Sequence, residues 1–216
     1  MTTRETGDNT RKAGAPWFHQ YVALDLETSG LSPQYDQVLQ VAVVPMEAGQ
    51  IIGEPYYKRV LPLDKFRISR EALAAQIGEV TPDTLKKWWE DITRDGEESR
   101  EVLEGLRQWA LDGGYDALPV VAHNASFDWG FFNQWVYIWR VRMGHRSPLG
   151  PLWICTKETA QRHPHFAGAR SFNLDIVSQG LGMPPRPKAH DALQDAILAG
   201  QVYHALTSGE MEWKKN

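Results

Sequence analysis

The chain has 216 residues, of which 42% are hydrophobic and 23% charged, and this composition excludes a wholly disordered protein. Its length fits one domain with a sizeable core. The formal net charge of −4 excludes a protein that grips nucleic acid through bulk positive charge, as histones do, but it leaves room for a local binding groove. The single cysteine, Cys155, excludes an internal disulfide or a thiolate metal cage.

The ends of the chain carry no targeting signal that we can identify. Residues 1–16 are polar and lack the apolar run of a secretory signal. No stretch approaches the ~18 apolar residues that a membrane span needs, so we expect no membrane partner. We expect a disordered tail at residues 1–16, a single domain at residues 17–207, a tail at residues 208–216 and a cytoplasmic location.

The first half of the domain contains runs of residues that favour strands, followed by sequence that favours helices. Strands are predicted at residues 21–27, 37–46 and 56–61. Their short connections favour antiparallel pairing. Apolar residues at helical spacing then predict helices at residues 69–77, from Thr84 onward, and at residues 97–111, with a loop from Asp112.

The second half combines short apolar strands with helices. A strand is predicted at residues 119–123, an aromatic helix at residues 127–143, a strand that ends near Cys155, and helices at residues 157–162, 174–182 and 192–206. Three strands followed by helices and further strands predict an α/β fold with a mixed central sheet flanked by helices. Arg140, Arg142 and Arg146 form a basic patch that is either a phosphate-tracking surface or a solvated helix face.

The first feature with chemical meaning is the pair Asp25 and Glu27 at the end of the first predicted strand. Side chains two residues apart in a strand point to the same face of the sheet. Two carboxylates on one face repel each other, and Mg²⁺ or Mn²⁺, which prefer oxygen ligands, would offset that repulsion. A solvated strand end is the alternative, because the D-x-E pattern alone is common.

Another carboxylate, Asp128, follows a different apolar strand in the segment that begins at His123. Helix capping can account for this segment, with Asn124 or Ser126 as the N-cap and Asp128 favoured in the first turn by the helix dipole. We expect a structural role for His123. Capping does not explain why carboxylates follow two separate strands.

The last feature is the pair His190 and Asp195 around the start of the final predicted helix. Asp191 and Gln194 have the spacing of a capping box, which predicts a structural role for Asp191. Asp195 lies one turn into the helix among apolar residues, where an ionised carboxylate is costly unless it is paired or bound to metal. His190 lies in the preceding loop, where an imidazole can move, although most loop histidines are only solvated.

These features occur in the order D-x-E, N-x-x-F-D and H-x-x-x-x-D. In this order and spacing the sequence resembles the DEDDh family of 3′→5′ exonucleases, which includes ribonuclease T and the proofreading subunit of bacterial DNA polymerase III. The resemblance covers residues 21–206 and implies a ribonuclease H-like fold. Two positions depart from the family pattern. Gln40 stands where the family frequently has a glutamate. Glu79 is an extra residue, and this second departure bears on substrate specificity.

By this resemblance the catalytic residues are Asp25, Glu27, Asp128, His190 and Asp195. The four carboxylates would hold two divalent cations, Mg²⁺ or Mn²⁺, which activate water and stabilise the leaving oxygen in phosphodiester hydrolysis. His190, with an unperturbed pKa of about 6.5, would be the general base. The resemblance therefore implies a metal-dependent 3′→5′ exonuclease that releases nucleoside 5′-monophosphates from single-stranded DNA or RNA ends.

The resemblance also implies which residues hold the substrate and leaves two alternative functions open. The implied substrate-binding residues are Thr28, Ser29, Gly30, Leu31, Asn124 and Phe127. One alternative is an RNA 3′-end maturation enzyme that, like ribonuclease T, works as a homodimer. The other is a non-catalytic module on the same fold that binds nucleic acid or a polymerase, which a missing carboxylate or histidine would favour; none is missing.

Overall fold

The computed structural model describes residues 18–63, 67–143, 147–186 and 190–208. The tails expected at residues 1–16 and 208–216 lie outside these residues, except for Ser208. The side chains of the basic patch formed by Arg140, Arg142 and Arg146 also lie outside them. Among the helices that are described, none is both long and apolar enough to cross a membrane.

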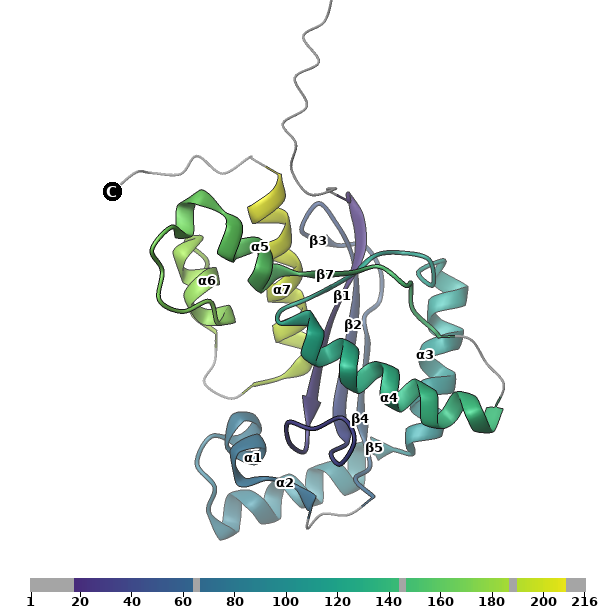
Figure 1. The fold of residues 1–216 in the computed structure, drawn as a ribbon. Helices are drawn as coiled ribbons and strands as arrows, with labels where there is room; N and C mark the ends of the chain where they lie inside the picture. Colours follow the sequence, from purple (N-terminus) through teal and green to yellow (C-terminus); the bar gives the residue numbers. More distant parts are fainter. Residues whose placement is uncertain (1–17, 64–66, 144–146, 187–189, 209–216) are drawn as a thin grey trace, which may run out of the picture.

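A seven-stranded sheet forms the centre of the described part of the chain (Figure 1). Its spatial order is β5-β4-β2-β1-β6-β7, and β3 pairs with β2. The strands are β1 (Gln20–Thr28), β2 (Val38–Glu47), β3 (Gln50–Ile51), β4 (Tyr56–Val60), β5 (Gly96–Glu97), β6 (Val120–Ala122) and β7 (Trp153–Cys155). β1, β2 and β4 pair antiparallel, whereas β6 runs parallel to β1 and β7 parallel to β6. The predicted mixed sheet is therefore confirmed.

The helices occupy the segments in which the sequence predicts them. They are α1 (Arg70–Ile77), α2 (Pro82–Asp95), α3 (Ser99–Gly113), α4 (Ala125–Met143), α5 (Thr156–Arg162), α6 (Leu174–Gly180) and α7 (Ala192–Thr207). Ser69 and Asp191 cap α1 and α7 by accepting hydrogen bonds from backbone N–H groups in the first turn. The loop predicted from Asp112 starts later, because α3 continues to Gly113 and ends at Gly114, which has a left-handed φ of 69°.

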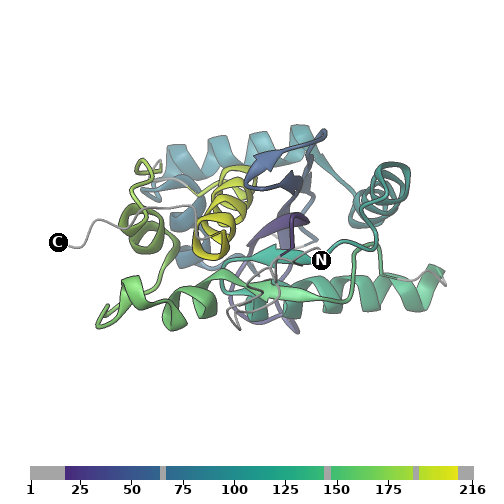
Figure 2. The same ribbon diagram turned by 90° about the horizontal axis from the view of Figure 1, so that it is seen from above.

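The two faces of the sheet pack against different helices (Figure 2). Val22, Leu24 and Leu26 of β1 belong to a core with α3 and α4. Tyr21 and Ala23 belong to a second core with α7. Because side chains alternate along a strand, Asp25 and Glu27 continue the face that α7 covers.

Helix α7 lies unusually close to the sheet at Gly200. A Cβ atom at this position would lie 2.1 Å from Sδ of Met46 and 3.0 Å from Cβ of Ala23, and both of these side chains are fully buried. The Tyr21 hydroxyl donates a hydrogen bond of 2.8 Å to the Gly200 carbonyl. The close contact fixes the helix that carries Asp195 against the strand that carries Asp25.

We expect Gly200→Ala to lower the free energy of unfolding by about 1–3 kcal/mol, because the added methyl group overpacks this contact. Urea unfolding measures the change. Gly130→Ala is the matched control: Gly130 also lies inside a helix, but its added Cβ would come no closer than 3.3 Å to a neighbouring side chain, that of Pro33. A Gly200→Ala protein as stable as the Gly130→Ala protein would contradict the close contact.

Candidate active site

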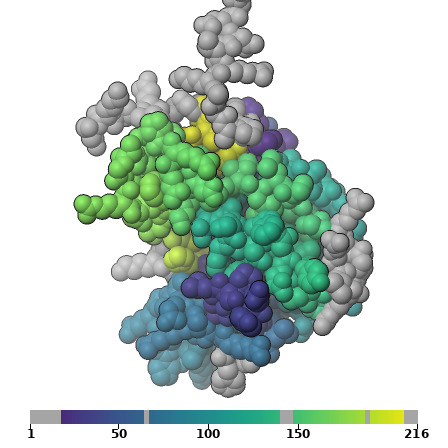
Figure 3. Space-filling view, in the orientation of Figure 1, coloured from purple at the N-terminus to yellow at the C-terminus, as the bar shows by residue number. Residues whose placement is uncertain are grey.

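All five predicted catalytic residues line one cavity of about 580 Å³. The end of β1 supplies Asp25 and Glu27, α4 supplies Asp128, and α7 with its preceding loop supplies Asp195 and His190. The parallel pairing of β1 and β6 explains the convergence, because carboxyl ends of parallel strands meet at the same edge. In Figure 3 the purple segment after β1 lies beside the teal residues of α4 and the blue residues of α1 and α2.

The turn between β6 and α4 directs Asp128 into the cavity. Asn124 adopts a left-handed conformation with φ of 67°, which asparagine tolerates better than most residues. Its carbonyl accepts a hydrogen bond from the Phe127 N–H group, and its side-chain oxygen accepts one of 3.4 Å from Lys157. Asp128 follows in the first turn of α4 with 3% of its surface exposed.

The carboxylates perturb one another. Burial raises the pKa of Asp25 well above its usual range, and the neighbouring Asp128 and Glu27 raise it further. Burial, followed by the charge of Asp195, raises the pKa of Glu27 to about 8. Burial also raises the pKa of Asp128. Such mutual shifts are typical of carboxylates that share a cation or a proton.

Arg186 is a site residue that the sequence analysis missed. Its guanidinium forms ion pairs with Asp195 and with Asp175, the latter at 2.5 Å, and its Nη2 lies 3.4 Å from Nε2 of His190. Its charge partly opposes the rise in the pKa of Asp25 and Glu27. The sequence feature that could have identified Arg186 is its position as a cationic residue four residues before His190.

His190 is tied to the site by its backbone and its imidazole. Its N–H group donates a hydrogen bond of 2.9 Å to the Ala75 carbonyl on α1, and Nδ1 lies 3.5 Å from Oδ2 of Asp195. One ligand atom each from Glu27, His190 and Asp195 lies within 4.8 Å of the others. Carboxylate oxygens with an imidazole nitrogen form a donor set that fits a divalent cation.

His123 lines the same cavity, and both of its ring nitrogens have hydrogen-bond partners. Its Nε2 lies 2.9 Å from the Phe172 carbonyl and its Nδ1 lies 2.8 Å from the Thr156 hydroxyl. A carbonyl only accepts, so the proton of the neutral ring lies on Nε2. Burial lowers the pKa of His123 to about 4, which keeps the ring neutral at pH 7.

The predicted substrate-binding residues divide into two groups. Thr28, Gly30, Leu31 and Phe127 line the cavity, whereas Ser29 and Asn124 do not. Ser29 is fully buried, and its hydroxyl accepts a hydrogen bond from the Gln37 N–H group.

Gly30 shapes the same loop by its lack of a side chain. A Cβ atom there would lie 2.4 Å from a carboxylate oxygen of Asp36. The same carboxylate accepts a hydrogen bond from the Ser32 N–H group. Glycine at position 30 therefore allows this loop to close, and Leu31 beside it is left 85% exposed at the cavity.

Comparison with known proteins connects this geometry to a family. Residues 22–203 match the family model RNase_T, described as exonuclease. The chain is 30% identical over 184 residues to DNA polymerase III PolC-type of Thermotoga maritima, which covers 85% of the chain. It is 36% identical over 113 residues, or 52% of the chain, to the protein of the same name from Bacillus cereus. These stretches are 11% and 7% of the two polymerases, so the chain spans only a small part of these relatives.

Solved structures with a similar fold include two exonucleases. Exonuclease I from Methylocaldum szegediense superposes with a TM-score of 0.62 at 19% identity, over 88% of this chain and 41% of that protein. Exonuclease I from E. coli in complex with an oligonucleotide gives a TM-score of 0.64 at 16% identity, over 89% of this chain and 41% of that protein. At this identity the likeness shows the fold, and it confirms the ribonuclease H-like class.

In EDTA we expect the melting temperature of the protein to fall by several degrees as the pH rises from about 4.5 to 8. The raised pKa of Glu27, about 8 against 4.5, means that the folded state binds more protons than the unfolded chain in this window, so stability is lost as the pH rises. Glu27→Gln should weaken the dependence of the melting temperature on pH. The control Glu101→Gln changes an exposed residue on α3 and should leave this dependence unchanged. Equal pH profiles of the melting temperature for the two variants would contradict the raised pKa of Glu27.

Proposed function

The chain belongs to the RNase_T exonuclease family, and from this premise we propose that it is a metal-dependent 3′→5′ exonuclease of the DEDDh type. It hydrolyses single-stranded nucleic acid from the 3′ end and releases nucleoside 5′-monophosphates. The observation that carries the proposal is the convergence of Asp25, Glu27, Asp128, His190 and Asp195 in one cavity. These residues come from three separate elements, and a fold without this chemistry has no need to assemble them.

Two divalent cations, Mg²⁺ or Mn²⁺, fit the charge and chemistry of the donor set. Glu27 and Asp195 present carboxylate oxygens within 4.8 Å of each other, and Asp25 and Asp128 add two further carboxylates to the same cavity. When bound, the ions lower the pKa of the attacking water and stabilise the charge on the scissile phosphate and leaving oxygen. The mutual repulsion that raises the carboxylate pKa values favours uptake of positive charge.

We assign the role of general base to His190. The other histidine at the cavity, His123, has both ring nitrogens occupied by Phe172 and Thr156. The His190 imidazole is 39% exposed and can accept a proton from a water molecule near neutral pH. The carboxylate of Asp195 at 3.5 Å stabilises the imidazolium that results.

Apolar side chains of the cavity have the properties needed to hold a strand end. Leu31 is exposed at the cavity, and Phe127 is another apolar residue of its lining. Leu31 and Phe127 can contact a terminal base by stacking or apolar contact. The cavity continues along Ser69, Ala72 and Ala75 of the α1 region, and we place the terminal nucleotide between the loop after β1 and this helix.

DNA is the substrate that the relatives favour. The related curated proteins are DNA polymerases, and E. coli Exonuclease I, which shares the fold, has been solved with a dT13 oligonucleotide. We therefore propose single-stranded DNA as the preferred strand and RNA as the weaker substrate.

With Mn²⁺ and 5′-labelled single-stranded DNA, the protein should give a ladder that shortens from the 3′ end, and 3′-labelled DNA should release only mononucleotide. Asp25→Asn should abolish this hydrolysis and reduce the rise in melting temperature that millimolar Mn²⁺ produces by binding the folded state. Asp116→Asn is the control, because Asp116 is an exposed aspartate in a turn. This variant should retain both hydrolysis and the rise in melting temperature with Mn²⁺. Full activity in Asp25→Asn would refute the metal assignment.

His190→Ala should reduce the rate of hydrolysis by about 10²–10⁴-fold and keep most of the Mn²⁺-induced rise in melting temperature. This pair of readouts separates a general base from a metal ligand, because loss of a ligand would lower both. His165→Ala is the control, since His165 bonds the Gly180 carbonyl away from the cavity. An unchanged rate in His190→Ala would mean that another group accepts the proton.

A further inference from the structure

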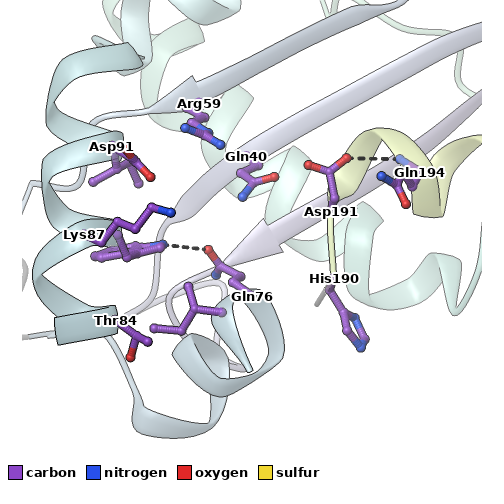
Figure 4. A pocket seen from close by; sticks show the side chains of 12 residues that line it. Gln40, Arg59, Gln76, Thr84, Lys87, Asp91, His190, Asp191 and Gln194 are labelled. Atoms are coloured by element: carbon purple, nitrogen blue, oxygen red, sulfur yellow. Dashed lines mark hydrogen bonds between the residues drawn. The ribbon is translucent and has the colours of Figure 1, made fainter. Parts of the chain in front are cut away.

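A second cavity, of about 450 Å³, adjoins the candidate active site (Figure 4). It lies between α2, the strands β2 and β4, and the start of α7, and it is lined by residues of all four. His190 lines both cavities. In Figure 4 its imidazole points away from the other labelled side chains, so a ligand in the second cavity would lie behind the proposed base.

The acidic side chains of this second cavity already have partners. Asp191 accepts hydrogen bonds on one oxygen from the N–H groups of Leu193 and Gln194, and on the other from the Tyr57 hydroxyl at 3.0 Å. Asp91 pairs with Arg94 at 3.0 Å. Neither carboxylate is left to attract a cation.

The polar groups that remain available in the second cavity are donors. Lys87 has no ion pair among the described residues, and it extends from α2 into the cavity toward Gln40 (Figure 4). Oε1 of Gln40 accepts a hydrogen bond from the Ala192 N–H group and lies 3.3 Å from the Tyr57 hydroxyl, whose proton goes to Asp191. Its Nε2 has no partner among the described residues. Arg59 pairs with Asp95 at 3.3 Å and also interacts with the Tyr57 hydroxyl. Because both carboxylates of the cavity are already paired, the Lys87 ammonium and the Gln40 amide are groups that can bind an anion there.

We propose that this second cavity binds the phosphate group of a nucleotide, with Lys87 as the principal charged contact and Arg59 and Gln40 as supporting donors. The apolar part of the lining, Trp88, Ile77 and Ile92, provides a surface for the attached nucleoside, and the volume lies within the range of small-ligand sites. The choice of a nucleotide over other anions rests on the proposed function, which places nucleotide phosphates on the other side of His190.

Two sources can supply such a phosphate: the released nucleoside 5′-monophosphate, or the backbone of a strand bound to the enzyme. A bound nucleotide would contact the segment that fixes His190 and Asp191. Occupancy of the second cavity would therefore act on the base, and free product would slow the enzyme without competing for the catalytic cavity.

The test measures binding by isothermal titration calorimetry in EDTA at low salt, so that the carboxylates of the active site, without cations, repel phosphates. The probes are deoxyadenosine 5′-monophosphate and a dT oligomer, titrated separately. Lys87→Gln should weaken binding about tenfold, the factor that about 1.4 kcal/mol corresponds to. Lys86→Gln is the matched control, because Lys86 is the adjacent residue on the same helix and pairs with Glu90 at 3.8 Å.

Lys87-dependent binding of the mononucleotide would assign the second cavity to free product, and Lys87-dependent binding of the oligomer alone would assign it to the strand backbone. Equal affinities of Lys87→Gln and Lys86→Gln for both probes would overturn the proposal. Tighter binding in Asp25→Asn would also overturn it, since removing a repelling carboxylate strengthens binding if the ligand occupies the catalytic cavity. Hydrolysis is assayed separately, so an inactive protein that still shows Lys87-dependent binding would refute the proposed function alone.

Discussion

Repulsion among the carboxylates at the end of β1 is the constraint on which the site depends. Asp25, Glu27, Asp128 and Asp195 lie in one cavity, and burial makes each negative charge more costly than it would be in water. Rigid elements hold them there: β1 is paired on both edges, and α7 is fixed to it. Arg186 neutralises only part of this charge. The negative charge that Arg186 leaves unneutralised favours the binding of cations.

The sequence predicts much of this arrangement because local patterns determine it. Apolar runs locate β1 and β2, capping residues locate α1 and α7, and Asp195 is an unexpected carboxylate among the apolar residues of α7. Local patterns say little about residues that depend on tertiary contact. The position of Arg186 before His190 is visible in the sequence, but its ion pairs with Asp175 of α6 and Asp195 of α7 form only when these helices lie side by side. The two-residue strands β3 and β5 are too short to show a strand pattern. The internal bonds of Ser29 follow from the fold of its loop.

Helix α1 connects the two cavities. The carbonyl of Ala75 holds the backbone of His190, and the side chain of Gln76, one residue later, donates to the carbonyl of Thr28 at the end of β1. Gln76 also accepts a hydrogen bond of 3.4 Å from the indole of Trp88 on α2. One short helix thus contacts the proposed base, the end of the catalytic strand and the wall of the second cavity. A shift of α1 would therefore move its contacts with His190, with the end of β1 and with the second cavity together.

The hydrogen bond between Tyr21 and Gly200 spans 179 residues of sequence. The strand that bears Asp25 and Glu27 is synthesised before any other described element, and the helix that bears Asp195 after all of them. Such distant contacts form late in folding, because a long loop must close before they contribute. A nascent or partly folded chain therefore holds an incomplete set of the proposed ligands, and the proposed chemistry requires that α7 has docked. Under this proposal, assembly of the domain and onset of its chemistry are the same event.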